Sequence, residues 1–346
     1  MRNAALIVAL MVLGAFALPT AAQADEWANC KGDDFKTVVA SCSKLMKNSK
    51  LNRSQFIEAL TNRAWAYYNT DDNTNALADY TECLKRDAAN VICLNGMSGT
   101  YVAMEWHQDA ITVADKVIAL NPRNQYAYMN KGNALHATGS YLQAIEQYNK
   151  AIDVAPGWVR AFYRRGRSYN EVDRYEDAIA DFDKVMLIDP SYTIALGARG
   201  YSHRVLNHLD KALDDLNAAT AADAKDDWSF VERGMVLLKR NENEKALADF
   251  DTGISMAPTV TWYYGQRGIA HLRLGKTDAA KQDFERVLKT VKDDAIANVH
   301  LGQIYEKAGD KGAAKAFYRA AMTGTVSDPD TREAQKQALT LLAAIK

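Results

Sequence analysis

The sequence predicts an all-α fold in which eight helical hairpins of 34 residues stack into a solenoid. Three features with this period support the prediction: a small residue and an alanine recur in every repeat, and a proline recurs in several. The small residues are Ala64, Ser98, Gly132, Gly166, Gly200, Gly234, Gly268 and Gly302; the alanines are Ala76, Ala110, Ala144, Ala178, Ala212, Ala246, Ala280 and Ala314; the prolines are Pro122, Pro156, Pro190 and Pro258.

The fourth repeat shows why these positions define a hairpin. Gly166 on its first helix and Ala178 on its second are expected where the two helices cross, because larger side chains there would separate the backbones. Tyr169 and Phe182 are expected to fill the seam beside the crossing, and Pro190 ends the second helix. Because one hairpin has no core of its own, the copies must stack to bury both faces.

Residues 1–24 have the pattern of an export signal. Arg2 precedes an apolar run, and Ala22-Gln23-Ala24 matches a cleavage site before Asp25. The alternative is a short membrane anchor, but the run is shorter than the ~20 residues that a spanning helix needs. We therefore expect a periplasmic or secreted protein that has no stable membrane insertion after cleavage.

Residues 25–56 fall outside the 34-residue phase and are expected to cap the stack. Within them Val38, Cys42 and Leu45 lie at i, i+4 and i+7, which places them on one face of a helix. Val38 precedes Ala76, its counterpart in the next second helix, by more than one period. We interpret this segment as an N-terminal half-repeat with extra residues in its connection.

The repeats resemble the tetratricopeptide repeat (TPR), whose pattern W-x2-L-G-x2-Y…A-x3-F…P has a 34-residue period. The resemblance implies a right-handed solenoid with a C-terminal capping helix at 329–346. The opening Trp27…Cys30…Cys42, followed by repeats that begin N-R-A or R-G, resembles exported TPR proteins of Gram-negative bacteria, particularly alphaproteobacteria. The predicted repeats are 57–90, 91–124, 125–158, 159–192, 193–226, 227–260, 261–294 and 295–328.

All four cysteines lie in the N-terminal part of the chain, and in an oxidising compartment an even number favours disulfides. Four cysteines allow three pairings. The pair Cys30–Cys42 would close the cap, and Cys83–Cys93 would join the second helix of repeat one to the first helix of repeat two. The alternative is four buried cysteines that act as small apolar residues.

Composition and motifs argue against several functions. The chain has 42 basic and 43 acidic residues, so it lacks the electrostatic signature of a nucleic-acid-binding protein. We find no catalytic motif, no metal-ligand spacing and no cofactor-binding loop. His203 and His271 occupy the position of Tyr169 in the repeat, so they are predicted to be seam residues. The sequence therefore predicts no enzyme, no metal and no cofactor.

The TPR resemblance implies that first helices line a concave groove. It also brings Asn130, Arg160 and Arg164 to three of the five positions of the carboxylate clamp, which holds a C-terminal carboxylate; Asn95 and Gly99 replace the other two. A solvated polar groove is the alternative. The predicted partner-binding residues are Asn130, Asn133, Arg160, Tyr163, Arg164, Arg167, Tyr201, Arg204, Trp228, Met235 and Trp262.

Five repeats share an arginine just before the crossing residue and an aspartate sixteen residues later, and the other three lack both. The two positions lie at matching heights on antiparallel helices, so we expect a partly buried structural ion pair in each. The predicted pairs are Arg63–Asp79, Arg165–Asp181, Arg199–Asp215, Arg233–Asp249 and Arg267–Asp283.

These observations predict a non-enzymatic scaffold that binds a peptide or an extended protein segment. Once five arginines are assigned to structural pairs, the remaining groove cations include Arg160, Arg164, Arg167 and Arg204, which favours a partner that is acidic or has a free C-terminal carboxylate. Two alternatives are an enzyme subunit that acts on cell-wall saccharides and a self-assembling envelope component. A saccharide hydrolase needs paired inward carboxylates, whereas the groove positions contain only isolated ones.

Overall fold

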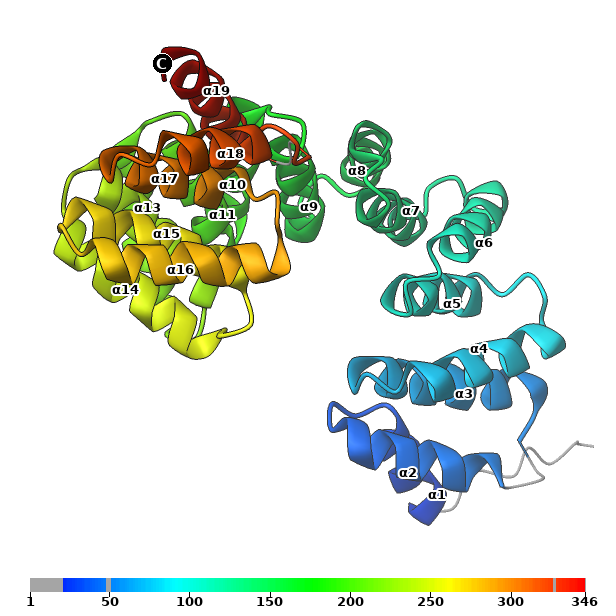
Figure 1. Cartoon of the computed structure of the whole chain (residues 1–346). Coiled ribbons are helices and arrows are strands. Elements are labelled where there is room, and N and C mark those ends of the chain that lie inside the picture. Colours follow the sequence, from blue (N-terminus) through cyan, green and yellow to red (C-terminus); the bar gives the residue numbers. More distant parts are fainter. Residues whose placement is uncertain (1–20, 48–50, 326–327, 346) are drawn as a thin grey trace, which may run out of the picture. The chain divides into compact units, whose positions relative to one another are not determined.

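The computed structural model describes residues 21–47, 51–325 and 328–345. The chain divides between Ser140 and Tyr141 into two compact units (Figure 1). The predicted signal, residues 1–24, lies almost wholly outside the described residues. Every regular element in the described residues is a helix, which confirms the all-α prediction. No helix among them is both long and apolar enough to cross a membrane.

The first unit contains a stack of helical hairpins. Helices α3 and α4 pack against each other, α4 packs against α5, and the first helices α3 and α5 also touch. Its helices are α1 (Ala21–Cys30), α2 (Phe35–Met46), α3 (Arg53–Asn69), α4 (Asn73–Arg86), α5 (Val91–Ala103), α6 (His107–Leu120) and α7 (Gln125–Ala137).

The second unit follows the same scheme and ends in an additional helix. Its helices are α8 (Tyr141–Val154), α9 (Val159–Asn170), α10 (Tyr175–Ile188), α11 (Ile194–Val205), α12 (Leu209–Ala222), α13 (Asp227–Lys239), α14 (Asn243–Met256), α15 (Thr261–Arg273), α16 (Thr277–Thr290), α17 (Ala295–Lys307), α18 (Lys311–Ala321) and α19 (Pro329–Ala344). Helix α19 packs on α17 and α18.

The first helices form the inner layer of the second unit. Helix α9 contacts α11, and the same contact repeats from α11 to α13, α15 and α17, whereas the second helices make no comparable contacts with one another. A stack in which one layer is closer together than the other must curve toward the closer layer. The first helices therefore line the concave side of this unit.

Each hairpin turns at a residue with left-handed backbone. These residues are spaced 34 apart, with φ between 59° and 86°. In the fourth repeat the amide of Arg174 donates to the carbonyl of Tyr169, which closes the Schellman motif around Asp173. The eight residues are Asp71, Glu105, Gly139, Asp173, Asn207, Asn241, Gly275 and Gly309.

The small residue on the first helix accommodates a large side chain from the second. A Cβ atom added to Gly166 would lie 2.8 Å from the ring of Phe182, and one added to Gly234 would lie 2.6 Å from Phe250. Gly200 packs in the same way against Leu216. The glycines are therefore required by a side chain of the facing helix as well as by the close approach of the two backbones.

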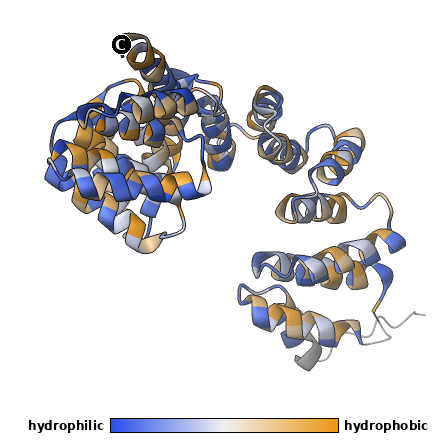
Figure 2. Ribbon diagram, in the orientation of Figure 1, coloured by the Kyte–Doolittle hydropathy of each residue, from blue (hydrophilic) through white to orange (hydrophobic). Residues whose placement is uncertain are grey.

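The helices carry apolar residues beside polar ones, as amphipathic helices of a stack should (Figure 2). The N-terminal segment that the sequence predicted as a capping half-repeat contains two helices. Helix α2 carries the buried face of Val38, Cys42 and Leu45, and the short helix α1 packs against it. The predicted cleavage point before Asp25 falls within α1.

Candidate functional site

Three adjoining hollows on the inner layer of the second unit form a continuous depression, which we call the groove. Two of them share Arg167 and Ala198, and Trp228 lines all three. The largest has a volume of about 560 Å³ and includes Tyr163 and Ile194. The groove therefore extends from α9 to the beginning of α17, and the beginning of α19 forms one of its walls.

One end of the groove is a cavity of about 340 Å³, which we call the tryptophan pocket. Tyr201, Trp228, Met235 and Trp262 line it, all of which the sequence predicted as groove residues. The rings of Tyr201 and Trp228 lie 6.0 Å apart. Met235 is buried and Trp262 is exposed at the rim. The pocket thus has an aromatic wall that is open to a partner.

Arg204, the fifth predicted groove residue in this pocket, does not present a free cation. Its side chain is 2% exposed, and its Nε donates to Oε2 of Glu232 at 2.6 Å. Its Nη1 donates to Oδ2 of Asp330 on α19 at 3.0 Å. Burial lowers the pKa of Arg204, but the charges of these two carboxylates outweigh burial, so the pKa is raised. The prediction that Arg204 is an unpaired cation was wrong, because α19 returns to the inner layer and brings Asp330 with it.

Two further carboxylates, neither of them predicted from the sequence, line the tryptophan pocket. Asp294 caps α17 by accepting a hydrogen bond from the amide of Ala297 at 2.8 Å, and Asp328 caps α19 through the amide of Thr331 at 2.8 Å. Burial is the main factor that raises the pKa of Asp294, and the charge of Asp328 adds to it. Their positions before helices are recognisable as N-caps, but no local pattern indicates that both face the groove.

At the other end of the groove, α9 carries three arginines, of which Arg167 lines the groove. Arg160 and Arg164, which the sequence also predicted as groove residues, are not among the residues that line it. Arg160 is exposed, and Arg164 and Arg167 are half-buried. Within the described residues none of the three has a carboxylate within ion-pair distance, so they remain candidates for binding an anion. Tyr163 is buried beside them, and its pKa is raised by burial, which the charge of Arg167 opposes.

Asn130 and Asn133 lie on α7 in the first unit, so they are described apart from the groove. Both are half-buried. The side-chain amide of Asn130 donates to the backbone carbonyl of Asn95 on α5 at 3.0 Å. This bond joins two first helices of the first unit and occupies one of the amide donors that a clamp would use.

The five arginine–aspartate pairs share one geometry. In each pair Nε and Nη2 of the arginine donate to the two carboxylate oxygens, over 2.6–2.9 Å. The hydrogen bonds to Asp249 raise the pKa of Arg233 above its ordinary value. The pairs are Arg63–Asp79, Arg165–Asp181, Arg199–Asp215, Arg233–Asp249 and Arg267–Asp283.

These arginines also connect consecutive hairpins. Nη1 of Arg199 donates to Asp183 on the preceding second helix at 2.6 Å, and Arg267 does the same with Asp251 at 2.9 Å. The third repeat has no aspartate after its basic residue, but Lys131 donates to Asp115, sixteen residues before it, at 2.7 Å. This acceptor lies before the basic residue and not after it, so the sixteen-residue pattern of the other repeats does not predict it.

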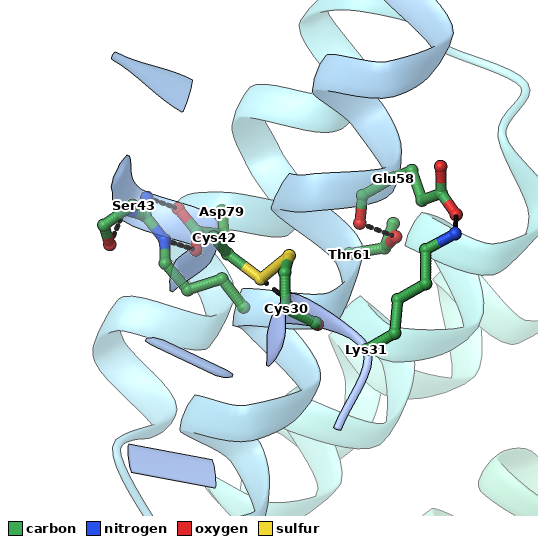
Figure 3. Close-up of a disulfide and its surroundings, with 8 residues drawn as sticks. Cys30, Lys31, Cys42, Ser43, Glu58, Thr61 and Asp79 are labelled. Atoms are coloured by element: carbon green, nitrogen blue, oxygen red, sulfur yellow. Dashed lines mark hydrogen bonds and ion pairs between the residues drawn. A yellow bond between two sulfur atoms is a disulfide. The ribbon is translucent and has the colours of Figure 1, made fainter. Parts of the chain in front are cut away.

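The cysteines form two disulfides, Cys30–Cys42 between α1 and α2, and Cys83–Cys93 between α4 and α5. Figure 3 shows the first bond inside the cap, with Lys31 directed toward Glu58 on α3. Lys31 and Glu58 are 2.6 Å apart, so an ion pair joins the cap to the first repeat.

Comparison with known proteins agrees with this architecture. Two family models described as tetratricopeptide repeat match residues 57–90, 100–158, 159–192 and 266–329, together more than half of the chain. The small glutamine-rich tetratricopeptide repeat-containing protein of Dictyostelium discoideum is 30% identical over 125 residues, which are 36% of this chain and 37% of that protein. The chain thus spans little more than a third of the length of this relative.

Two solved structures show the same fold. A chain of the APC/C hetero-tetramer Cut9-Hcn1 superposes with a TM-score of 0.62 at 15% identity, over 89% of this chain and 60% of that chain. PilW, titled a type IV pilus biogenesis factor, superposes with a TM-score of 0.54 at 17% identity, over 60% of this chain and 94% of that chain. At these identities the likeness is one of fold.

Proposed function

Because the chain belongs to the tetratricopeptide repeat family, whose members generally mediate protein–protein interactions, we propose that it is a non-enzymatic scaffold that binds an extended segment of a partner protein in the groove. The observation that carries the proposal is the continuity of the three hollows along the first helices. A continuous depression can hold several consecutive side chains of an extended segment.

The chemistry of the groove suggests how the segment is oriented. The arginines of α9 supply charge-assisted hydrogen bonds for an acidic side chain or a terminal carboxylate. Trp228, Met235 and Trp262 supply apolar surface at the other end. An acidic residue of the partner therefore binds near Arg160 and Arg164, and an apolar part of the segment reaches the tryptophan pocket.

We also propose that the protein acts after export, in the periplasm or outside the cell. The predicted signal and the two disulfides, which persist in oxidising compartments, support this proposal. Thiol titration and intact mass of protein purified from its native source test it. A mature chain that begins at Asp25 and has no titratable thiol is expected; four free thiols would contradict export.

A crosslinking experiment tests the proposed groove. A photoreactive amino acid is placed at Ile194, which is exposed in the groove, and at Leu187, which is exposed on the second helix α10. Crosslinking to the same partner segment from position 194 and not from 187 is expected. Equal crosslinking from both positions would place the binding surface elsewhere.

Affinity measurements with the identified segment then test the role of α9. The double substitution Arg160→Glu and Arg164→Glu should weaken binding about tenfold or more, because charge-assisted bonds are lost and repulsion replaces them. Lys184→Glu with Lys211→Glu makes the same charge change on exposed residues of second helices and should leave affinity nearly unchanged. Added salt should weaken the parent more than the Arg160/Arg164 variant. Unaltered affinity of that variant would exclude these arginines from the site.

A further inference from the structure

We infer that the tryptophan pocket binds the basic side chain, arginine or lysine, of the segment held in the groove. This inference rests on the proposed function, and it adds a basic residue to the acidic one that the bound segment is proposed to carry. The observation that motivates it is the charge of the pocket, which is opposite to that of α9.

The carboxylates of the pocket outnumber its cations. Glu232, Asp294, Asp328 and Asp330 line it together with one guanidinium, that of Arg204. Arg204 is already held by Glu232 and Asp330, so its charge is compensated within the protein. Lys239 on α13 does not line the pocket; burial lowers the pKa of its ammonium, and its charge acts on Asp330 and Glu232. The residues that line the pocket therefore carry more negative than positive charge.

The aromatic wall favours a cation over other ligands. Trp228 and Trp262 come from consecutive first helices, and Tyr201 lies beside Trp228. Indole rings attract ammonium and guanidinium groups most strongly among aromatic side chains. The guanidinium of Arg204, 5.3 Å from the centre of the Tyr201 ring, already makes such a contact at the edge of the pocket. A cation from the bound segment can lie over the face of Trp228 or Trp262.

A buried amide provides an independent indication of a ligand. Gln266 lines the tryptophan pocket and is 6% exposed as a whole residue, and no hydrogen bond of its side chain is found among the described residues. Its amide atoms are not among the fully enclosed polar atoms that lack a partner, so they face the pocket. A polar group that lines a pocket without a protein partner binds water or a ligand there. The amide oxygen of Gln266 can accept a hydrogen bond from an arginine or lysine side chain. Aromatic faces, carboxylates and an amide acceptor together match a long basic side chain.

The volume agrees with this occupant. A cavity of about 340 Å³ is at the lower end of the range for small-ligand sites, so it fits one side chain rather than a folded element. A segment with an acidic residue at α9 and a basic residue in the tryptophan pocket would be complementary to both ends of the groove.

The probe is acetyl-Gly-Arg-Gly-amide, titrated into the full-length chain with ¹⁵N-labelled tryptophan. The chain has six tryptophans, and Trp228→Phe and Trp262→Phe assign the two pocket indoles. Saturable shifts of these two indole signals, with the other four unchanged, are expected. The matching peptide with citrulline, which has nearly the shape of arginine without its charge, should bind at least about tenfold more weakly. Equal binding of the citrulline peptide would overturn the inference.

Substitutions that remove a carboxylate charge but preserve the helix cap test whether Asp294 and Asp328 bind the basic side chain. Asp294→Asn and Asp328→Asn together should weaken binding of the arginine peptide about tenfold, because asparagine caps a helix well but has no charge. Asp310→Asn is the matched control, since Asp310 caps α18 in the same way and does not line the pocket. Thermal unfolding verifies that all variants fold. Full affinity of the double variant would contradict a cation site.

A saccharide is the competing occupant, because tryptophans and carboxylates also line sugar sites. Chitotriose is therefore titrated in parallel. Shifts of the pocket indoles by chitotriose and none by the arginine peptide would overturn the inference. If the arginine peptide fails while the partner segment still crosslinks to position 194, the inference alone is wrong and the proposed scaffold function stands.

Discussion

Arg233 and Arg204 lie on the first helices of neighbouring repeats, and each binds a carboxylate, yet the two regions differ in origin. Arg233 finds Asp249 sixteen residues along the chain, across its own hairpin. Arg204 binds Glu232 of the next repeat and Asp330, 126 residues away. The first contact is set by local hairpin geometry and recurs in five repeats. The second exists because the curved stack returns α19 to its inner layer.

The largest effect is expected at Arg204. Glu232→Ala leaves a guanidinium that is 2% exposed with Asp330 as its remaining partner, so the free energy of unfolding should fall by about 3–5 kcal/mol. Asp249→Ala should cost less, because the side chain of Arg233 is 21% exposed and water can reach it. Urea unfolding of the two variants measures the difference. Equal losses would mean that the two regions do not differ in solvation.

A smaller effect is expected at the hairpin crossing. Gly234→Ala places a Cβ 2.6 Å from the ring of Phe250, so the ring must move and the free energy of unfolding should fall by about 1–3 kcal/mol. Gly265→Ala on α15 is the matched control, because its added Cβ would lie 3.8 Å from its nearest neighbour. Comparable stability of both variants in thermal unfolding would show that the crossing tolerates a methyl group.

The ion pair across the hairpin should show coupling in a double-mutant cycle. The interaction energy from Arg233→Ala, Asp249→Ala and the double variant should be about 1–2 kcal/mol. The reason is that both carboxylate oxygens of Asp249 accept hydrogen bonds from Arg233. The three stabilities come from urea unfolding under identical conditions. Additive losses would indicate that the contact contributes little in solution.

The smallest effect is expected at the turns, and it is stabilising. Glu105 has φ 61°, which costs a residue with a Cβ more than glycine, so Glu105→Gly should raise the free energy of unfolding by about 0.5–1 kcal/mol. Asn241→Gly should gain less, because asparagine tolerates this conformation better. A loss of stability in Glu105→Gly would show that the flexibility of glycine in the unfolded chain outweighs the relief of strain.

The fold was predictable because the residues that define each hairpin lie close together in the sequence and recur in every repeat. The 34-residue spacing predicted the helical hairpins, and Gly166 opposite Phe182 shows the steric reason for the small residue. The aspartate sixteen residues after Arg165 was sufficient to propose an ion pair, because two positions in one hairpin have a fixed relation. Four of the groove residues that line the tryptophan pocket follow the same period, since Tyr201 and Met235 occupy equivalent positions of consecutive first helices, as do Trp228 and Trp262.

The charge of the pocket was not predictable in this way. Asp294 and Asp328 belong to turns, and Asp330 begins the helix that follows the last repeat. Whether such residues reach the groove depends on the small rotation between repeats, which accumulates along the stack. The sequence by itself determined the hairpins, their crossings and the identity of the inner layer. Only the tertiary structure decided that Arg204 is neutralised and that the tryptophan pocket is acidic, because those contacts join residues that no period relates.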